Sequence, residues 1–120
     1  MEEITVKLTF NKEVVMVNMY DNPTSRDFLA QLPLTITIED YAKTEKIAYL
    51  PKKLSIEKAP PGCIPSVGDF TYYAPWGNLA IFYKDFGYSN GLIKLGKIES
   101  GIEKLESVHG NFTVEIEKID

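Results

Sequence analysis

Apolar and polar residues alternate at the start of the chain, which is the period expected for a strand with one buried face. Residues 4–10 show this alternation, and residues 13–20 supply a second apolar strand. Asn11-Lys12 between them is a candidate for a two-residue turn, because asparagine tolerates positive φ. These residues are therefore predicted to form an antiparallel hairpin.

A helix is predicted directly after the hairpin. Asn22 can cap it, Pro23 suits its first position, and residues 24–27 have the spacing of a capping box. Pro33 ends the helix, whose apolar residues share one face: Phe28, Leu29 and Leu32.

Strand patterns separated by turns fill most of the remaining chain. Further strands are predicted at residues 34–39, 45–50, 69–74, 78–84, 92–98 and 112–117. Residues 75–77 form a tight turn within one hairpin. Four prolines mark residues 51–65 as an irregular connection, in which residues 54–58 are expected to add a short edge strand.

A second helix and the overall fold class follow from the same pattern. Residues 100–103 have capping-box spacing, and the helix they predict buries Ile102 and Leu105 before His109-Gly110 ends it. Short alternating strands with few helices favour a closed antiparallel barrel, because closure removes the exposed edges. We therefore predict a mainly β protein, a closed eight-stranded barrel with two short helices, formed by residues 1–120 as a single domain.

Composition and charge reduce the range of partners and sites that this protein is expected to have. Lysine and arginine number 13 against 17 acidic residues, so the net charge of −4 disfavours nucleic acid and anionic membranes as partners. The start of the chain is acidic and no apolar run is long enough to span a bilayer, which predicts a cytoplasmic protein. The one cysteine, Cys63, forms no disulfide framework, and the one histidine, His109, excludes a two-histidine metal site. We expect no metal and no cofactor.

Aromatic residues are concentrated between residues 70 and 88. Packing in the barrel explains those that alternate along strands. Trp76, Phe86 and Tyr88 instead occupy turn or loop positions, where burial is not automatic. Such residues can form an aromatic wall for a small planar ligand, a proline ring or an extended peptide.

The motif Gly68-Asp69-Phe70-Thr71, followed by residues 92–101 and the second helix, resembles the cyclophilins in order and spacing. The longer string at residues 68–83 resembles a group of small prokaryotic cyclophilin-like proteins, and so do four shorter motifs: Asn22-Pro23, Leu32-Pro33-Leu34, Asp40-Tyr41 and Glu45-Lys46-Ile47. The resemblance covers nearly the whole chain and implies an eight-stranded barrel capped by two helices.

Cyclophilins are peptidyl-prolyl isomerases whose groove carries an arginine, a phenylalanine five residues later and a glutamine shortly before the Gly-Asp-Phe motif. Counting back from Gly68, this chain places Lys58, Cys63 and Ser66 there. A lysine lacks the planar fork of donors that arginine offers. We therefore predict no catalytic residues and no efficient isomerase activity.

Three functions remain open at this point. The first is a non-catalytic module that binds a small molecule or peptide against Trp76, Phe82, Phe86 and Tyr88, with a polar contact from Asn78 or Glu45. The second is a weak isomerase that uses Lys58 as its electrostatic donor, which places Lys58 among the candidate site residues. The third is a structural interaction module that presents a sheet face to another subunit, including a copy of itself.

Overall fold

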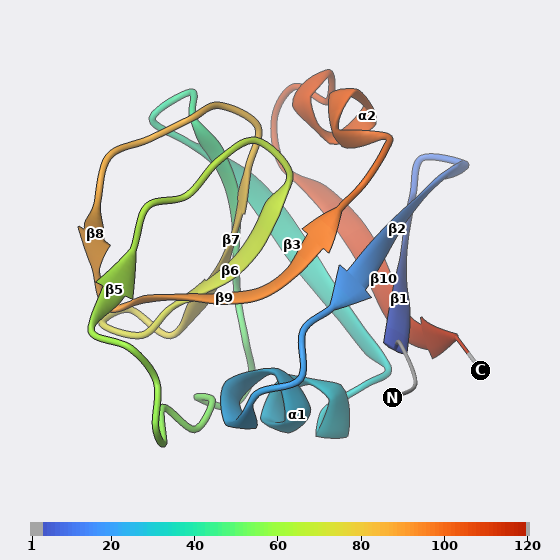
Figure 1. Cartoon of the computed structure of the whole chain (residues 1–120). Helices are drawn as coiled ribbons and strands as arrows, with labels where there is room; N and C mark the ends of the chain where they lie inside the picture. Colours follow the sequence, from blue (N-terminus) through green and yellow to red (C-terminus); the bar gives the residue numbers. More distant parts are fainter. Residues whose placement is uncertain (1–3, 120) are drawn as a thin grey trace.

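Eight strands close into an antiparallel barrel, in the order β1-β10-β3-β4-β7-β6-β9-β2, and a two-stranded sheet of β5 and β8 lies outside it (Figure 1). The computed structural model describes residues 4–119. The elements are β1 (Ile4–Phe10), β2 (Glu13–Met19), α1 (Pro23–Ala30), β3 (Leu34–Tyr41), β4 (Glu45–Tyr49), β5 (Gly62–Cys63), β6 (Asp69–Tyr73), β7 (Asn78–Phe82), β8 (Ser89–Asn90), β9 (Leu92–Ile98), α2 (Ile102–Glu106) and β10 (Phe112–Ile119). The predicted fold class is confirmed.

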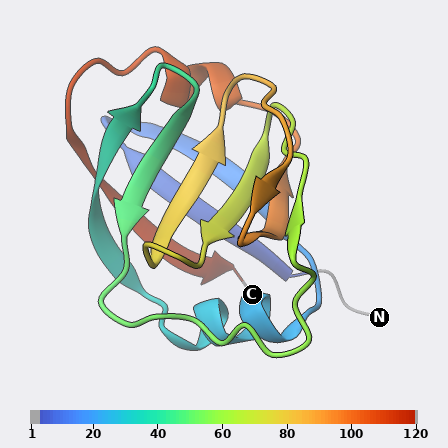
Figure 2. The ribbon, with the colours of Figure 1, turned by 90° about the vertical axis from the view of Figure 1, so that its left-hand side faces the viewer.

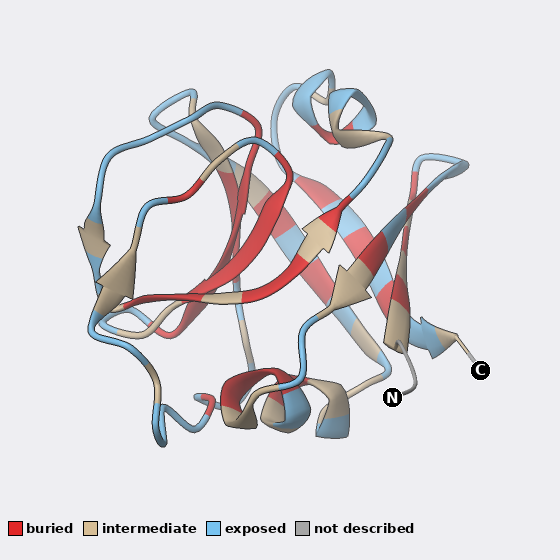
Figure 3. Ribbon diagram, viewed as in Figure 1, coloured by how far each residue is buried: buried red, intermediate tan, exposed pale blue. Residues whose placement is uncertain are grey.

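The barrel interior is the main hydrophobic core. Inward residues alternate with outward ones, as β10 shows most regularly: Phe112, Val114 and Ile116 are buried and the residues between them are exposed (Figure 3). Helix α1 lies at one end of the barrel and α2 at the other (Figure 1). Phe28 of α1 is fully buried, with its ring edge-on to that of Phe70 at 5.5 Å between centroids. The helices therefore cover the core where the strands end.

The turn and helix-cap predictions for residues 11–27 are confirmed in part. Asn11 and Lys12 both adopt positive φ, as the predicted hairpin turn requires. Asn22 caps α1 by accepting a hydrogen bond from the Ser25 amide at 2.8 Å. The capping box at residues 24–27 is wrong: the Asp27 carboxylate accepts a hydrogen bond from the Ser55 amide instead, since Asn22 already bonds the Ser25 amide.

The capping box predicted at residues 100–103 is also wrong. Helix α2 begins after Gly101, which adopts a left-handed conformation with φ of +93° and makes no side-chain cap. Glycine reaches this conformation at little cost, so the chain turns into α2 without help from Ser100.

The short edge strand predicted at residues 54–58 does not form. Side chains bond the backbone of this segment instead of a neighbouring strand: the Leu54 amide donates to the Tyr72 hydroxyl at 3.0 Å, and the Ser55 amide donates to Asp27. The extra pairing occurs between β5 and β8, where Gly62 faces Asn90 and Cys63 faces Ser89.

A smaller apolar cluster lies on the outer surface of the barrel. Ile47, Ala80, Phe82 and Leu92 form it, with Cys63 and Tyr73 packed against them. These residues alternate along their strands with the inward-facing Ala48, Leu79 and Ile81, so they point away from the main core. Figure 2 faces this outer surface of β4, β7 and β6, with β5 and β8 beside it.

Within residues 4–119, none of the helices has both the length and the apolar character that crossing a bilayer requires.

Candidate functional site

A cavity of about 190 Å³ opens on this outer surface, between the barrel wall and the segment that leads into β8. Its lining comes from six strands and two connecting segments and consists of Tyr41, Glu45, Tyr73, Trp76, Asn78, Phe82, Phe86, Ser89 and Leu92. We call it the aromatic pocket. Five of the seven predicted site residues therefore share one cavity: Glu45, Trp76, Asn78, Phe82 and Phe86.

Strand pairing explains why residues distant in sequence meet here. Glu45 of β4 pairs with Tyr41 of β3 on one side and with Phe82 of β7 on the other. Tyr73 of β6 pairs with Asn78 of β7. Paired residues point to the same face of a sheet, so these side chains all reach the outer surface.

The aromatic rings hold one another in place while leaving surface free. Trp76 lies edge-on to Tyr41 at 5.7 Å and to Tyr73 at 5.3 Å between ring centroids, yet it is 49% exposed. Phe86 is 51% exposed, and its ring lies 6.3 Å from that of the buried Phe82. A rigid aromatic side chain with an open surface is typical of binding sites, because ordering it costs little entropy.

Two polar groups in the pocket have unused hydrogen-bonding capacity. Neither a hydrogen bond nor an ion pair from residues 4–119 reaches the Glu45 carboxylate, and its burial raises the pKa of this group to about 6. Asn78 is 1% exposed, and its Nδ2 donates to the Leu79 carbonyl. Its Oδ1 accepts no hydrogen bond within the described chain. Unpaired buried polar groups are unfavourable, so both are more useful to a ligand than to the fold.

Glu45→Gln is expected to raise the unfolding free energy at neutral pH by about 1 kcal/mol, after discounting for partial exposure. The folded-state pKa lies above the unfolded value of 4.5, so the native protein favours the protonated form and ionisation above pH of about 6 destabilises it. Urea unfolding at several pH values measures this. The advantage of the variant should shrink as the pH falls below 6 toward 4.5; an advantage that grows on acidification contradicts the assignment.

The other two predicted site residues lie elsewhere. Tyr88 is 55% exposed and is not part of the pocket lining. Lys58 lines a different cavity of about 390 Å³, together with Tyr20, Asn22, Pro23, Thr24, Glu57, Ala59, Pro60, Cys63, Ile93 and Lys94. Counting back from Gly68 matches Lys58 and Cys63 to the cyclophilin arginine and phenylalanine, so two of the three positions compared in that way line this second cavity.

Three polar side chains of the second cavity, those of Asn22, Thr24 and Lys94, are engaged in the fold. Asn22 caps α1 and also donates to the Lys94 carbonyl, while the Thr24 hydroxyl donates to the Ser55 carbonyl. Burial raises the pKa of the Cys63 thiol, an effect that nearby Lys94 reduces and Asp69 increases. The thiol is therefore protonated at neutral pH and a poor nucleophile. Among residues 4–119, no cluster of three or more histidine, cysteine or acidic side chains is arranged to hold a metal ion.

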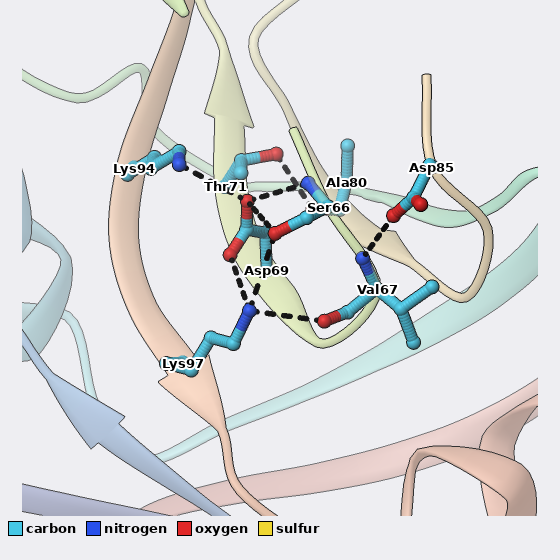
Figure 4. A network of polar contacts seen from close by, with 8 residues as sticks. All are labelled: Ser66, Val67, Asp69, Thr71, Ala80, Asp85, Lys94 and Lys97. Atoms are coloured by element: carbon cyan, nitrogen blue, oxygen red, sulfur yellow. Dashed lines mark hydrogen bonds and ion pairs between the residues drawn. The ribbon is translucent and has the colours of Figure 1, made fainter. Parts of the chain in front are cut away.

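A buried carboxylate next to this second cavity is one that the sequence analysis did not identify. Asp69 is 1% exposed and lies within 3.3 Å of Lys94 Nζ and 3.2 Å of Lys97 Nζ (Figure 4). Its Oδ2 also accepts from the Ser66 amide at 2.8 Å, and Lys97 donates onward to the Val67 carbonyl at 3.0 Å. This network fastens the turn before β6 to β9.

Lys46 is the second buried charge that the sequence did not reveal. It points into the barrel end at 2% exposure, where its Nζ donates to the Val108 carbonyl at 2.8 Å and pairs with Asp40 at 3.3 Å. Burial acts to raise the pKa of Asp40, but hydrogen bonds from Tyr83 and Lys46 outweigh it and hold that pKa below its usual value. The network ties the segment after α2 to β3 and β4.

These features define a class of protein: a closed antiparallel barrel, capped by a helix at each end, with an aromatic pocket on its outer wall. The model of the Cyclophilin-like family matches residues 8–117, so the chain belongs to that family. A hypothetical protein of Archaeoglobus fulgidus, known from a solution structure, has a similar fold with a TM-score of 0.75. The two chains are 18% identical, and the similarity covers 98% of this chain and 95% of that one. No curated protein matches the chain.

Proposed function

We propose that this protein is a non-catalytic binding module whose ligand occupies the aromatic pocket. One observation carries the proposal: Glu45, Trp76, Asn78, Phe82 and Phe86, which the sequence suggested for their chemistry alone, line the same cavity. Exposed aromatic surface beside unsatisfied polar groups is the usual composition of a ligand site.

The size of the pocket limits what enters it. Sites for drug-sized molecules have volumes of about 300–1,000 Å³. The aromatic pocket, at about 190 Å³, is smaller. It therefore accommodates one chemical group, such as a peptide side chain or the head of a small molecule, while the rest of the ligand extends past the exposed rings of Trp76 and Phe86.

The larger cavity around Lys58 is the site of the alternative, a weak isomerase. Its asparagine, threonine and Lys94 groups are bound within the fold, and Lys58 lacks the planar donor fork of the cyclophilin arginine. The aromatic pocket, in contrast, contains a buried acceptor without a partner among residues 4–119, Asn78 Oδ1, beside the Glu45 carboxylate. We therefore place the binding function there.

Binding at the aromatic pocket is expected to depend on Trp76. We would titrate the isotope-labelled protein with an Ala-Pro peptide and a panel of neutral, cationic and anionic fragments, following the amide resonances of the protein and the cis/trans exchange of the peptide. Probes that bind should shift the amides of Glu45, Asn78 and Phe82 without accelerating exchange. Trp76→Ala should weaken binding by at least about tenfold, since it removes a large aromatic contact.

Tyr88→Ala is the matched control, because Tyr88 is an equally exposed aromatic residue outside the lining. It should leave the affinities unchanged. Shifts confined to the surroundings of Lys58 and Cys63, or an accelerated exchange that Lys58→Ala abolishes, would support the isomerase instead. If no probe in the panel shifts any amide, the proposed site is wrong.

A further inference from the structure

We infer that the aromatic pocket selects an organic cation, specifically a methylated or quaternary ammonium group carried on a small molecule or a side chain. This inference rests on the proposed function, since it names the chemical class that the same pocket would accept. Three features of the pocket point to it: the rings, the single carboxylate and the mainly apolar lining.

The rings provide an aromatic enclosure for positive charge. Five of the nine lining residues are aromatic: Tyr41, Tyr73, Trp76, Phe82 and Phe86. The face of an aromatic ring carries negative electrostatic potential and attracts cations within about 6 Å of the ring centroid, with tryptophan the strongest. Because Trp76 lies edge-on to both tyrosines, the rings surround the space from different directions rather than stacking against each other.

The charge of the lining has one sign. Glu45 is the only acidic residue of the lining, and the described lining contains no lysine, arginine or histidine to neutralise it. Glu45 belongs to neither of the two buried charged networks described above. Asp69 pairs with Lys94 and Lys97, and Lys46 pairs with Asp40. A neutral ligand would bury this carboxylate further without compensation, whereas a cation would pair with it.

The mainly apolar lining favours a methylated cation over a primary ammonium. A primary ammonium brings three N–H donors that must all be satisfied when it is buried. The Glu45 carboxylate and the buried Asn78 Oδ1 lack partners in the described part of the chain, and the hydroxyls of Tyr41, Tyr73 and Ser89 are further polar atoms, but six of the nine lining residues are aromatic or aliphatic. Methyl groups need no acceptor and pack against rings, so a methylated or quaternary ammonium fits this surface better.

Choline and dimethylbutanol form a matched pair of probes, because a carbon atom in the alcohol replaces the charged nitrogen. Trp76 is the only tryptophan in the chain, so its fluorescence reports directly on the pocket. Each probe is titrated against the wild-type protein, and we expect choline to saturate the signal at a concentration at least about tenfold lower than dimethylbutanol.

Glu45→Gln should raise the dissociation constant of choline toward that of dimethylbutanol, leaving only the preference that the rings supply, and leave the alcohol unaffected. Glu115→Gln is the control, since Glu115 is exposed on β10 and the substitution changes the net charge equally. It should not alter choline binding. Circular dichroism of each variant establishes that the barrel is folded.

The outcomes separate the two proposals. If the two probes bind equally, or if Glu45→Gln leaves the choline affinity unchanged, the pocket is a binding site but its preference for cations is refuted. If neither probe changes the fluorescence of Trp76 at any concentration up to their solubility, the cation inference is refuted; the fragment panel then decides separately whether the pocket binds anything.

Discussion

Asp69→Ala is expected to lower the unfolding free energy by about 3 kcal/mol, because it removes a buried carboxylate that pairs with two lysines and accepts hydrogen bonds from Ser66. Asp69 is 1% exposed, pairs with Lys94 and Lys97, and accepts hydrogen bonds from Lys97 and from the amide and hydroxyl of Ser66. Both lysines retain access to solvent, so they can be rehydrated after the change. The Ser66 amide and the turn before β6 lose their partner in the interior. For a chain of this length the midpoint of thermal unfolding should fall by about 10 °C.

Asp85→Ala is the control for this prediction, because Asp85 accepts one hydrogen bond in the same network, from the exposed Val67 amide at 3.1 Å. Its loss should reduce stability by about 1 kcal/mol or less. Denaturant unfolding of both variants gives the comparison. Equal effects for Asp69→Ala and Asp85→Ala would contradict the view that the buried carboxylate anchors β6 to β9.

Choline affinity is expected to fall about tenfold between about pH 7 and pH 5. Burial raises the pKa of Glu45 to about 6, so the side chain is mostly a carboxylate at the higher pH and mostly neutral at the lower one. The ionised carboxylate adds to the attraction of the rings, whereas the neutral acid does not, and affinity therefore increases with pH through this range. Fluorescence titration of Trp76 at a series of pH values measures the dependence.

Other titratable groups can be separated from Glu45 in the same experiment. Tyr41 and Tyr73 share the pocket, while Asp40, Lys43, Tyr83, Lys84 and His109 lie around a different cavity. In Glu45→Gln the pH profile of choline binding should become flat. A profile that persists in this variant would assign the dependence to another group, with His109 the first to replace.

The alternation of apolar and polar residues was sufficient to predict the barrel strands. Strands such as β1 and β10 face the core on one side and solvent on the other, so burial and sequence share a period of two. The β5–β8 pair has no such signal, because strands of two residues are too short to show a period. Its position depends on packing against the outer cluster, which only the folded barrel creates.

The candidate site was predictable in its chemistry but not in its boundaries. Loop aromatics and nearby polar residues suggested most of the lining, yet their convergence depends on the pairing of β4 with β7. Tyr41 was missed for the same reason, since it reaches the pocket through its pairing with Glu45. Lys58 and Tyr88 were grouped with these residues on sequence grounds, and the structure places both outside the pocket.

The burial of Lys46 and Asp69 could not be predicted from the sequence. Lysine on an alternating strand usually faces solvent, but Lys46 occupies an inward position that the segment after α2 closes over. Asp69 becomes buried only because β9 supplies two lysines beside it. In both cases the compensating partner comes from a distant part of the chain.

A crystal structure of the protein grown with choline tests the central claim most directly. The account predicts the trimethylammonium group in the aromatic pocket, within about 6 Å of the ring centroids of Trp76 and its neighbours and facing the Glu45 carboxylate. Choline in the cavity around Lys58, or an aromatic pocket without density at concentrations that saturate the Trp76 signal, would contradict it.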